Sequence, residues 1–308
     1  MTRAMFRQHN SGLDALLHRP RPSAWELFLR NPSTFIVRKL YSWRRLTQET
    51  RSDEQGQVSV VCISDTHNAQ CLIPDGDILI HAGDLTQSGS LEELRAAISW
   101  IQDQPHQFKF VIAGNHDLLL DPSKDGPGGE AALARRRIEW GGIQYLQDDS
   151  TTVSLKGRRL KIYGSPKSPR NGNWAFQYPR ESDVWKDTIP PDTDILITHG
   201  PPRAHLDLTT LGCPHLLQEL WRVHPVLHVF GHVHEGYGHE WVRFDSFQAA
   251  YERAILMGGG FWNLVGVLKS FVISSLSPPT FATCQLVNPS LVGGLRDDAR
   301  RRPIKVYI

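Results

Sequence analysis

The sequence predicts an α/β fold, and two features of the chain carry this prediction. Short apolar runs rich in β-branched residues alternate with segments whose apolar residues recur at helical spacing, the order typical of sheets covered by helices. Among 308 residues, 40% are hydrophobic, which is enough for a packed core. The net charge of +2 lacks the strong basicity of a general nucleic-acid coat protein, so we expect no nucleic-acid polymer as a partner.

The predicted elements follow one another from Val58 onward. Continuous apolar runs predict strands over 58–63, 77–81, 108–113, 194–198 and 226–230, with shorter strands over 144–146, 152–155 and 160–163. Helical spacing of apolar residues predicts helices over 91–102, 131–140 and 216–224. A closing strand is expected over 281–287.

Five of these strands end in a small cluster of Asp, His or Asn residues, usually beside glycine. The clusters are Asp65-Thr66-His67, Gly83-Asp84, Gly114-Asn115-His116-Asp117, His199-Gly200 and Gly231-His232-Val233-His234. Ligands of α/β folds bind at the carboxyl ends of strands. Carboxylates and amides mixed with imidazoles suit Mn²⁺, Fe, Zn²⁺ or Mg²⁺. The set exceeds the needs of one ion, so the sequence predicts two divalent ions joined by a shared carboxylate.

In this order and strand context, the five clusters resemble the motifs of the calcineurin-like metallophosphoesterase superfamily. Longer stretches are similar to its metallophosphoesterase-domain subgroup, which includes animal brain-expressed members. These stretches lie within residues 58–241 and read VCISDTH, DILIHAGDLTQSG, VIAGNHD, IYGSP, DILITHGPP, LGC and LHVFGHVHEGYG. The resemblance implies a four-layer α/β/β/α sandwich of two mixed sheets.

The resemblance also implies a role for each residue of the motifs. The ligands of one metal ion would be Asp65, His67 and His234. Those of the other would be Asn115, His199 and His232, with Asp84 bridging the two ions. A hydroxide held between the metals would attack phosphorus, His116 would protonate the leaving oxygen, and Asp117 would orient the His116 ring. Histidines outside the motifs are expected to be structural; they include His81, His106, His205, His215, His224, His228 and His239.

The substrate expected from these motifs is a nucleotide-like or other small phosphodiester. Protein phosphatases of the superfamily carry an Asp-Arg-Gly segment after their Gly-Asp, and the Arg is missing after Gly83-Asp84 here. In the loop Ser165–Arg180, Trp174 or Phe176 could stack on a base. Arg170 or Arg180 of the same loop could bind phosphate. That the loop aromatics only pack on the domain remains equally open. The alternatives are a phosphomonoesterase and a membrane-associated scaffold with weak or no turnover.

The predicted catalytic domain, residues 58–308, has two additions. Residues 1–57 form a basic, aromatic-rich arm: residues 1–51 hold ten Arg or Lys against three acids. An insertion of apolar character lies at about 242–280. Triple glycine and Lys269 argue against a membrane-spanning helix there. Two interpretations stay open: both additions pack on the domain, or together they make a peripheral contact with an anionic membrane.

Cysteine usage indicates where the protein resides. The four cysteines, Cys62, Cys71, Cys213 and Cys284, show neither a CxxC pair nor the spacing of a disulfide framework. A reduced, intracellular protein is therefore expected, in the cytoplasm and with membrane association left open.

Overall fold

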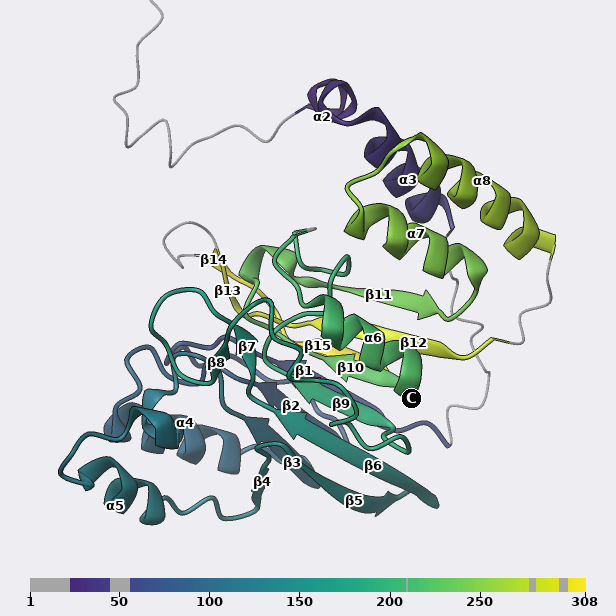
Figure 1. Ribbon diagram of the computed structural model, residues 1–308. Helices are drawn as coiled ribbons and strands as arrows, with labels where there is room; N and C mark the ends of the chain where they lie inside the picture. Colours follow the sequence, from purple (N-terminus) through teal and green to yellow (C-terminus); the bar gives the residue numbers. More distant parts are fainter. Residues whose placement is uncertain (1–22, 45–55, 209, 277–280, 294–298) are drawn as a thin grey trace, which may run out of the picture.

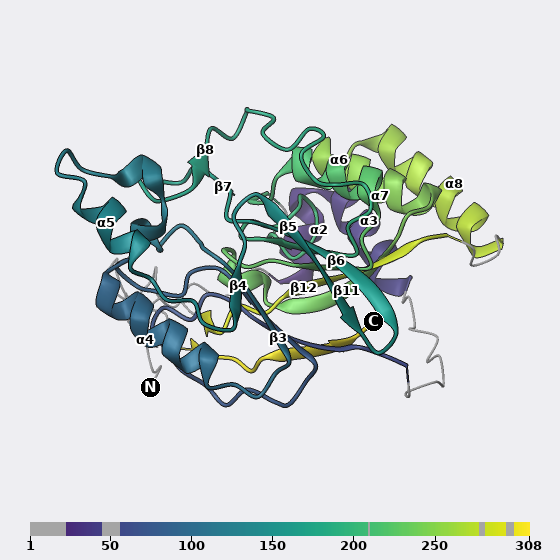
Figure 2. The same cartoon turned by 90° about the horizontal axis from the view of Figure 1, so that it is seen from below.

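Two mixed β-sheets stacked face to face form the centre of the molecule, with helices on their outer sides (Figures 1 and 2). The computed structural model describes residues 23–44, 56–208, 210–276, 281–293 and 299–308. Buried apolar side chains from both sheets fill the space between them, such as Val60, Ile80 and Phe110 from one and Ile195 and Val229 from the other. This arrangement confirms the predicted α/β fold of four layers.

The first sheet has the strand order β15-β1-β2-β3-β4. Its members are β1 (Ser59–Ile63), β2 (Ile78–Ala82), β3 (Phe108–Ile112), β4 (Ile143–Tyr145) and β15 (Ile304–Tyr307). Strands β1 to β4 are parallel, and β15 pairs antiparallel with β1. Helix α4 (Leu91–Gln102) covers the outer face with Leu94, Ile98 and Ile101. Its capping box of Ser90 and Glu93 explains why the helix begins at Leu91.

The second sheet has the strand order β11-β12-β10-β9-β6-β5. Its members are β5 (Asp149–Leu155), β6 (Arg158–Ser165), β9 (Ile195–Thr198), β10 (Leu227–Val229), β11 (Gly238–Arg243) and β12 (Thr283–Asn288). Helix α6 (Pro214–Val223) packs Leu216 and Leu220 onto its outer face. The shorter elements are α5 (Glu130–Arg136), β7 (Ser168–Pro169), β8 (Gln177–Tyr178), β13 (Val292–Gly293), β14 (Ala299–Arg300), and the 3-10 turns η1 (Leu118–Leu120), η2 (Pro122–Lys124) and η3 (His234–Gly236).

Four elements differ from the sequence prediction. Helix α5 ends at Arg136 rather than at Trp140, because Trp140 leaves the helix and stacks on Tyr145 at a ring distance of 4.5 Å. The strand expected to close the fold is β12, which lies inside the second sheet between β11 and β10. The edge strands β11 and β15 were not predicted: β11 has few apolar residues, and β15 alternates Ile304 and Val306 with exposed Lys305 and Tyr307 over only four residues.

Four helices form a layer on the second-sheet side of the molecule, and we call residues 23–44 and 246–276 the helical cap (Figure 1). The cap contains α2 (Ala24–Arg30) and α3 (Pro32–Trp43) from the arm and α7 (Ser246–Leu256) and α8 (Phe261–Leu276) from the insertion. Val37 and Leu40 of α3 are buried against Phe247, Tyr251 and Val267. The described parts of the two additions therefore pack on each other and on the domain.

Polar contacts fix the arm to the insertion at both ends of α3. At its start, the Asn31 side-chain amide donates to the Gly258 carbonyl at 2.9 Å. At its end, Arg44 pairs with Asp245, the N-cap residue of α7. Gly259 must be glycine here, since a Cβ would lie 2.4 Å from Ser33 Oγ and its φ is +92°. Among the described residues, we find no helix that has the length and apolar character needed to cross a bilayer.

A fully buried histidine joins the cap to the second sheet. His205 Nδ1 donates to Glu240 Oε1 on β11 at 2.6 Å, and its Nε2 donates to Glu252 Oε1 on α7 at 3.0 Å. Both ring nitrogens therefore carry hydrogen, which makes the ring cationic. Burial lowers the pKa of His205, but the two carboxylates outweigh it and raise the pKa to about 10. Around the triad, Trp221 donates to Glu252 at 2.6 Å, Gln248 donates to it at 2.8 Å, and the Tyr41 ring lies 6.1 Å from the imidazole.

We expect His205 to make the stability of the protein fall between neutral and alkaline pH. The folded pKa of about 10 lies above the unfolded value of about 6.5. The stabilisation from the charged ring is thus complete below about pH 6.5 and is lost as the pH rises through 10, by at most about 1.4 kcal/mol per pH unit. Urea unfolding at a series of pH values should show this slope in the unaltered protein and a smaller slope in His205→Gln. Equal slopes in the two proteins would contradict the assignment.

Candidate metal centre

The five polar clusters meet at one end of the two sheets, each directly after its strand. Four of the residues predicted as ligands have a left-handed backbone, with φ of 50° at Asp65, 44° at His67, 53° at Asp84 and 65° at His232. Non-glycine residues rarely adopt this conformation, because it costs free energy, and it concentrates at functional sites. The sharp turns bring side chains that follow β1, β2 and β10 to a common point.

One group of potential ligand atoms comes from Asp65, His67, Asp84 and His234, all within 4.8 Å of one another. His67 Nε2 and His234 Nε2 are 3.3 Å apart. His234 Nε2 lies 3.3 Å from Asp65 Oδ1, and His67 Nε2 lies 3.7 Å from Asp84 Oδ2. These residues are the predicted ligands of the first ion together with the predicted bridging carboxylate.

A second group shares Asp84 and adds His199 and His232. His199 Nε2 lies 3.4 Å from Asp84 Oδ2. The Asn115 Oδ1 atom is 2.9 Å from His199 Nε2 and 2.6 Å from His232 Nδ1, so the predicted amide ligand lies among the imidazoles. The structure thus brings all seven predicted ligands together, in the two overlapping sets that the motifs indicate.

Neighbouring groups hold these side chains in place. The backbone N–H of His116 donates to Asp84 Oδ1 at 2.7 Å, which leaves Oδ2 facing the histidines. His199 Nδ1 donates to the Ala82 carbonyl at 3.0 Å, which directs its Nε2 toward Asp84 and Asn115. Ser290 Oγ donates to Asp65 Oδ2 at 2.8 Å. Ser290 follows β12 in a segment without a histidine or acid, and nothing in its sequence context pointed to the site.

The charges around the cluster favour ionised carboxylates and two neutral imidazoles. Burial raises the pKa of Asp84, but the hydrogen bond and charge of His199 outweigh it and hold the pKa well below its usual range. Burial also raises the pKa of Asp65, and His234 likewise reverses this effect. Burial lowers the pKa of His232 to about 4, and it also lowers the pKa of His67. Ionised carboxylates and neutral imidazoles are the forms that bind metal ions.

The donor set therefore fits divalent cations. Two carboxylates, an amide oxygen and four imidazoles converge, and the Nε2 atoms of His67 and His234 lie only 3.3 Å from each other. Oxygen and imidazole ligands without a thiolate suit Mn²⁺, Fe, Zn²⁺ or Mg²⁺.

His116 and Asp117 lie beside this cluster, but Asp117 does not contact the His116 ring as predicted. The His116 Nδ1 donates to the Gln87 carbonyl at 2.8 Å, so a backbone oxygen orients the ring. Both oxygens of Asp117 are instead occupied by donors from two loops: Gly114 N at 2.7 Å, Thr86 Oγ1 at 2.7 Å, Thr86 N at 3.0 Å and Leu85 N at 3.2 Å. The buried Asp117 thus joins the loop of Asp84 to the loop of Asn115.

The four candidates for substrate contacts have different surroundings. Trp174 stacks on His116 at a ring distance of 4.2 Å and an angle of 23°, so it lies beside the cluster. Phe176 is half-buried and packs against the hydrophobic cluster on the outer side of the first sheet. The Arg180 guanidinium donates to the carbonyls of Arg170 and Leu211. Arg170 is exposed and donates its own N–H to Tyr178 at 2.8 Å.

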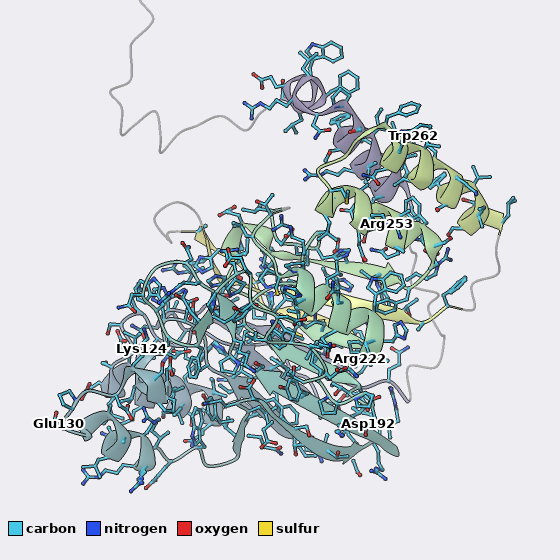
Figure 3. All side chains as sticks on the ribbon, in the orientation of Figure 1. Lys124, Glu130, Asp192, Arg222, Arg253 and Trp262 are labelled. Atoms are coloured by element: carbon cyan, nitrogen blue, oxygen red, sulfur yellow. The ribbon has the colours of Figure 1, made fainter. Side chains whose placement is uncertain are left out.

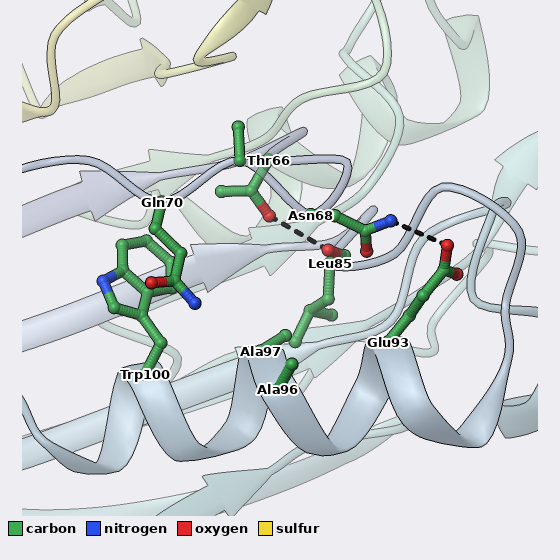
Figure 4. Close-up of a pocket in the computed structure, with 9 residues that line it drawn as sticks. Thr66, Asn68, Gln70, Leu85, Glu93, Ala96, Ala97 and Trp100 are labelled. Atoms are coloured by element: carbon green, nitrogen blue, oxygen red, sulfur yellow. Dashed lines mark hydrogen bonds between the residues drawn. The ribbon is translucent and has the colours of Figure 1, made fainter.

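A pocket of about 230 Å³ lies next to the His67 loop on the α4 side (Figure 4). It is lined by Thr66, Asn68, Gln70, Leu85, Glu93 and Trp100, among others, and Asn68 donates to Glu93 at 2.7 Å. None of the predicted ligands lines it, and neither does His116. The candidate metal site is therefore defined by the converging side chains and not by this cavity.

A two-sheet sandwich with Asp and His at its strand ends defines a class of metal-binding α/β proteins. The model of the calcineurin-like phosphoesterase family matches residues 58–236. The chain belongs to this family, and the membership supports a metal-dependent phosphoesterase.

Several proteins are similar to this chain. Probable rhamnogalacturonate lyase C of Emericella nidulans is 44% identical over 302 residues, 96% of this chain and 29% of that protein. Metallophosphoesterase domain-containing protein 1 of Homo sapiens is 39% identical over 208 residues, 59% of this chain and 62% of that protein, which confirms the predicted subgroup. The chain thus spans less than two thirds of either relative. The crystal structure of TT1561 of Thermus thermophilus has a TM-score of 0.40 and 14% identity, covering 60% of this chain and 84% of that one.

We expect Asp117→Asn to destabilise the protein. Because Asp117 is buried, the substitution leaves the molecular surface unchanged. The amide nitrogen would face backbone donors, so buried N–H groups would lose their acceptor, at a cost of about 1–3 kcal/mol in the free energy of unfolding. Urea unfolding measures this cost. The matched control is Asp192→Asn, because Asp192 is exposed and pairs with Lys161 at the surface; its effect should stay within about 0.5 kcal/mol. Equal stability of the two variants would contradict the joining role of Asp117.

Proposed function

We propose that the protein is a dinuclear metal-dependent phosphodiesterase that hydrolyses nucleotide-like or other small phosphodiesters. The observation that carries the proposal is the pair of ligand groups that share Asp84, with His116 at their edge. Membership of the calcineurin-like phosphoesterase family supports the same reaction class. Bound at this cluster, two divalent cations would supply Lewis-acid chemistry, which activates water at neutral pH and offsets phosphate charge.

His116 is the group that exchanges a proton with the substrate. Its Nδ1–H is held by the Gln87 carbonyl, so Nε2 is the atom left to donate a proton to the leaving oxygen. The ring lies at 4.6 Å from that of His67, which places it next to the proposed metal ligands without being one of them. Asp117 acts as a positioning residue, since it fixes the loop on which His116 sits.

Trp174 supports a substrate with an organic group on each side of phosphorus. Its ring covers one face of His116, and 37% of the residue is exposed, so part of it is open to a ligand. A base or other flat group of a diester would stack there while the phosphate meets the cluster. A phosphomonoester has a single organic group, its leaving group, so only that group could stack on Trp174. The diester is therefore the substrate class that the site favours.

Replacing the shared carboxylate should remove metal and activity together. We expect Asp84→Asn to lose both bound ions and at least about 10³-fold in kcat/KM on bis(4-nitrophenyl) phosphate, because Asp84 Oδ2 faces both groups of histidines. Metal analysis and the chromogenic assay measure these losses. Asp192→Asn is the control for a carboxylate outside the site. Full activity of Asp84→Asn would refute the mechanism. A preference for 4-nitrophenyl phosphate would indicate a phosphomonoesterase instead. Metal binding without turnover would indicate the membrane-associated scaffold.

The role of His116 is tested by substrates with different leaving groups. We expect His116→Ala to keep its metal content but to lose about 10²–10⁴-fold in kcat on alkyl esters, whose leaving oxygen needs a proton. The loss should be much smaller on 4-nitrophenyl esters, since 4-nitrophenolate leaves without protonation. His215→Ala, which alters a half-buried histidine paired with Asp183, is the matched control. A loss that is equal for all leaving groups would show that His116 has another role.

A further inference from the structure

The outer surface of the helical cap is unusually apolar. Thirteen of the twenty exposed large hydrophobic side chains of the described residues lie on the cap, although it is a small part of the chain. They are Trp25, Leu27, Leu29, Trp43, Leu256, Met257, Phe261, Trp262, Val265, Leu268, Val272, Ile273 and Leu276. Scattered exposed apolar residues are normal, but a concentration of this kind marks an interaction surface.

Helix α8 has apolar residues on both of its faces. Its inner face, with Leu264, Val267 and Phe271, packs on α3 and α7. Its outer face carries exposed apolar residues at helical spacing along the whole helix, from Phe261 to Leu276. Figure 1 shows α7 between α8 and the second sheet, and Figure 3 shows Trp262 at the start of α8. The outer face of α8 thus points to solvent in the described part of the chain.

The charges around this surface are almost all positive. Arg30, Lys39, Arg253 and Lys269 are exposed on the cap. The cap holds two acids: Glu26, which is exposed and caps α2, and Glu252, which is buried beside His205. The charge on the surface therefore complements an anionic partner.

We propose that the helical cap binds the surface of an anionic lipid bilayer, with α8 lying in the interface. A helix of 16 residues is about 24 Å long, which is too short to cross the hydrocarbon core but suits a helix parallel to the membrane plane. Phe and Trp side chains at its start are suited to the boundary between acyl chains and headgroups. The Lys269 side chain lies on the same exposed face and reaches headgroup phosphate, while its stem remains among apolar neighbours.

The cap gives this surface a rigid support. The inner face of α8 is buried against Val37 of α3 and Phe247 of α7, and α7 is held to the second sheet through His205. The exposed side chains of α8 are therefore presented as one surface in the folded protein. Binding requires little further ordering of the chain, so apolar contact and charge act together.

Sedimentation of the full-length protein with vesicles tests the proposal. We expect binding to phosphatidylcholine vesicles that contain phosphatidylserine, and at least tenfold weaker binding to phosphatidylcholine alone. Raising the salt from about 0.1 M to about 1 M should weaken the anionic binding, because the Debye length shortens from about 10 Å to about 3 Å. Binding that is equal for the two lipids, or absent from both, would overturn the proposal.

Matched variants separate the cap surface from other exposed residues. Val272→Glu, at 58% exposure on α8, should weaken vesicle binding at least tenfold, and Trp262→Glu should do the same. Leu133→Glu, at 53% exposure on α5, is the control and should bind as the unaltered protein does. Lys269→Gln combined with Arg253→Gln should remove most of the dependence on salt and phosphatidylserine. Vesicle binding by Val272→Glu and Trp262→Glu at the unaltered strength would contradict the proposed surface.

Two further measurements distinguish other occupants of the cap surface. If light scattering shows a dimer that Val272→Glu converts to a monomer, and vesicles are not bound, a second copy of the chain covers the surface and the lipid proposal is wrong. Hydrolysis of a soluble chromogenic diester should be unchanged in Val272→Glu, because the cap contributes no residue to the metal centre. Urea unfolding of Val272→Glu with the midpoint of the unaltered protein shows that the variant is folded, and this control keeps the test independent of the proposed phosphodiesterase activity.

Discussion

The structure depends on the Asp84 carboxylate, at which the two sheets meet. Asp84 follows β2 of the first sheet, and its Oδ2 faces His199, which follows β9 of the second. The close approach leaves no room for side chains: a Cβ on Gly114 would lie 2.3 Å from Asp84 Oδ1, and one on Gly83 would lie 2.6 Å from His199 Nδ1. The left-handed turns at the strand ends are tolerated because the hydrophobic layer between the sheets holds the strands beneath them.

The sequence allowed the fold class and the location of the site to be predicted because each cluster directly follows an apolar strand. Strand ends of α/β sheets share one edge, so residues far apart in the chain could be placed together. Contacts that consist only of hydrogen bonds could not be predicted from the sequence. Asp117 was expected to contact the His116 ring, and its carboxylate instead accepts from Thr86 and Gly114. Ser290 supports Asp65 from a segment without any recognisable motif.

The additions to the domain show a different limit of sequence reasoning. Their apolar and basic composition was evident, but composition did not decide whether they face the domain or another surface. In the structure their described parts pack on the domain, and α8 has an apolar inner face against α3 and α7 together with an apolar outer face toward solvent. Helical periodicity normally separates a buried face from a polar one, and that signal is weak in a helix that is apolar on all sides.

The loop of Trp174 is coupled directly to the metal centre. The Ala175 N–H donates to the Asn115 carbonyl at 3.0 Å, so a residue next to Trp174 is bound to the backbone of a proposed ligand. Trp174 itself lies against His116, the neighbour of Asn115. A movement of this loop therefore displaces the proposed general acid and the amide ligand together. Because Trp174, His116 and Asn115 are held together in this way, the proposed substrate contact through Trp174 and the proposed proton transfer through His116 would depend on the same loop.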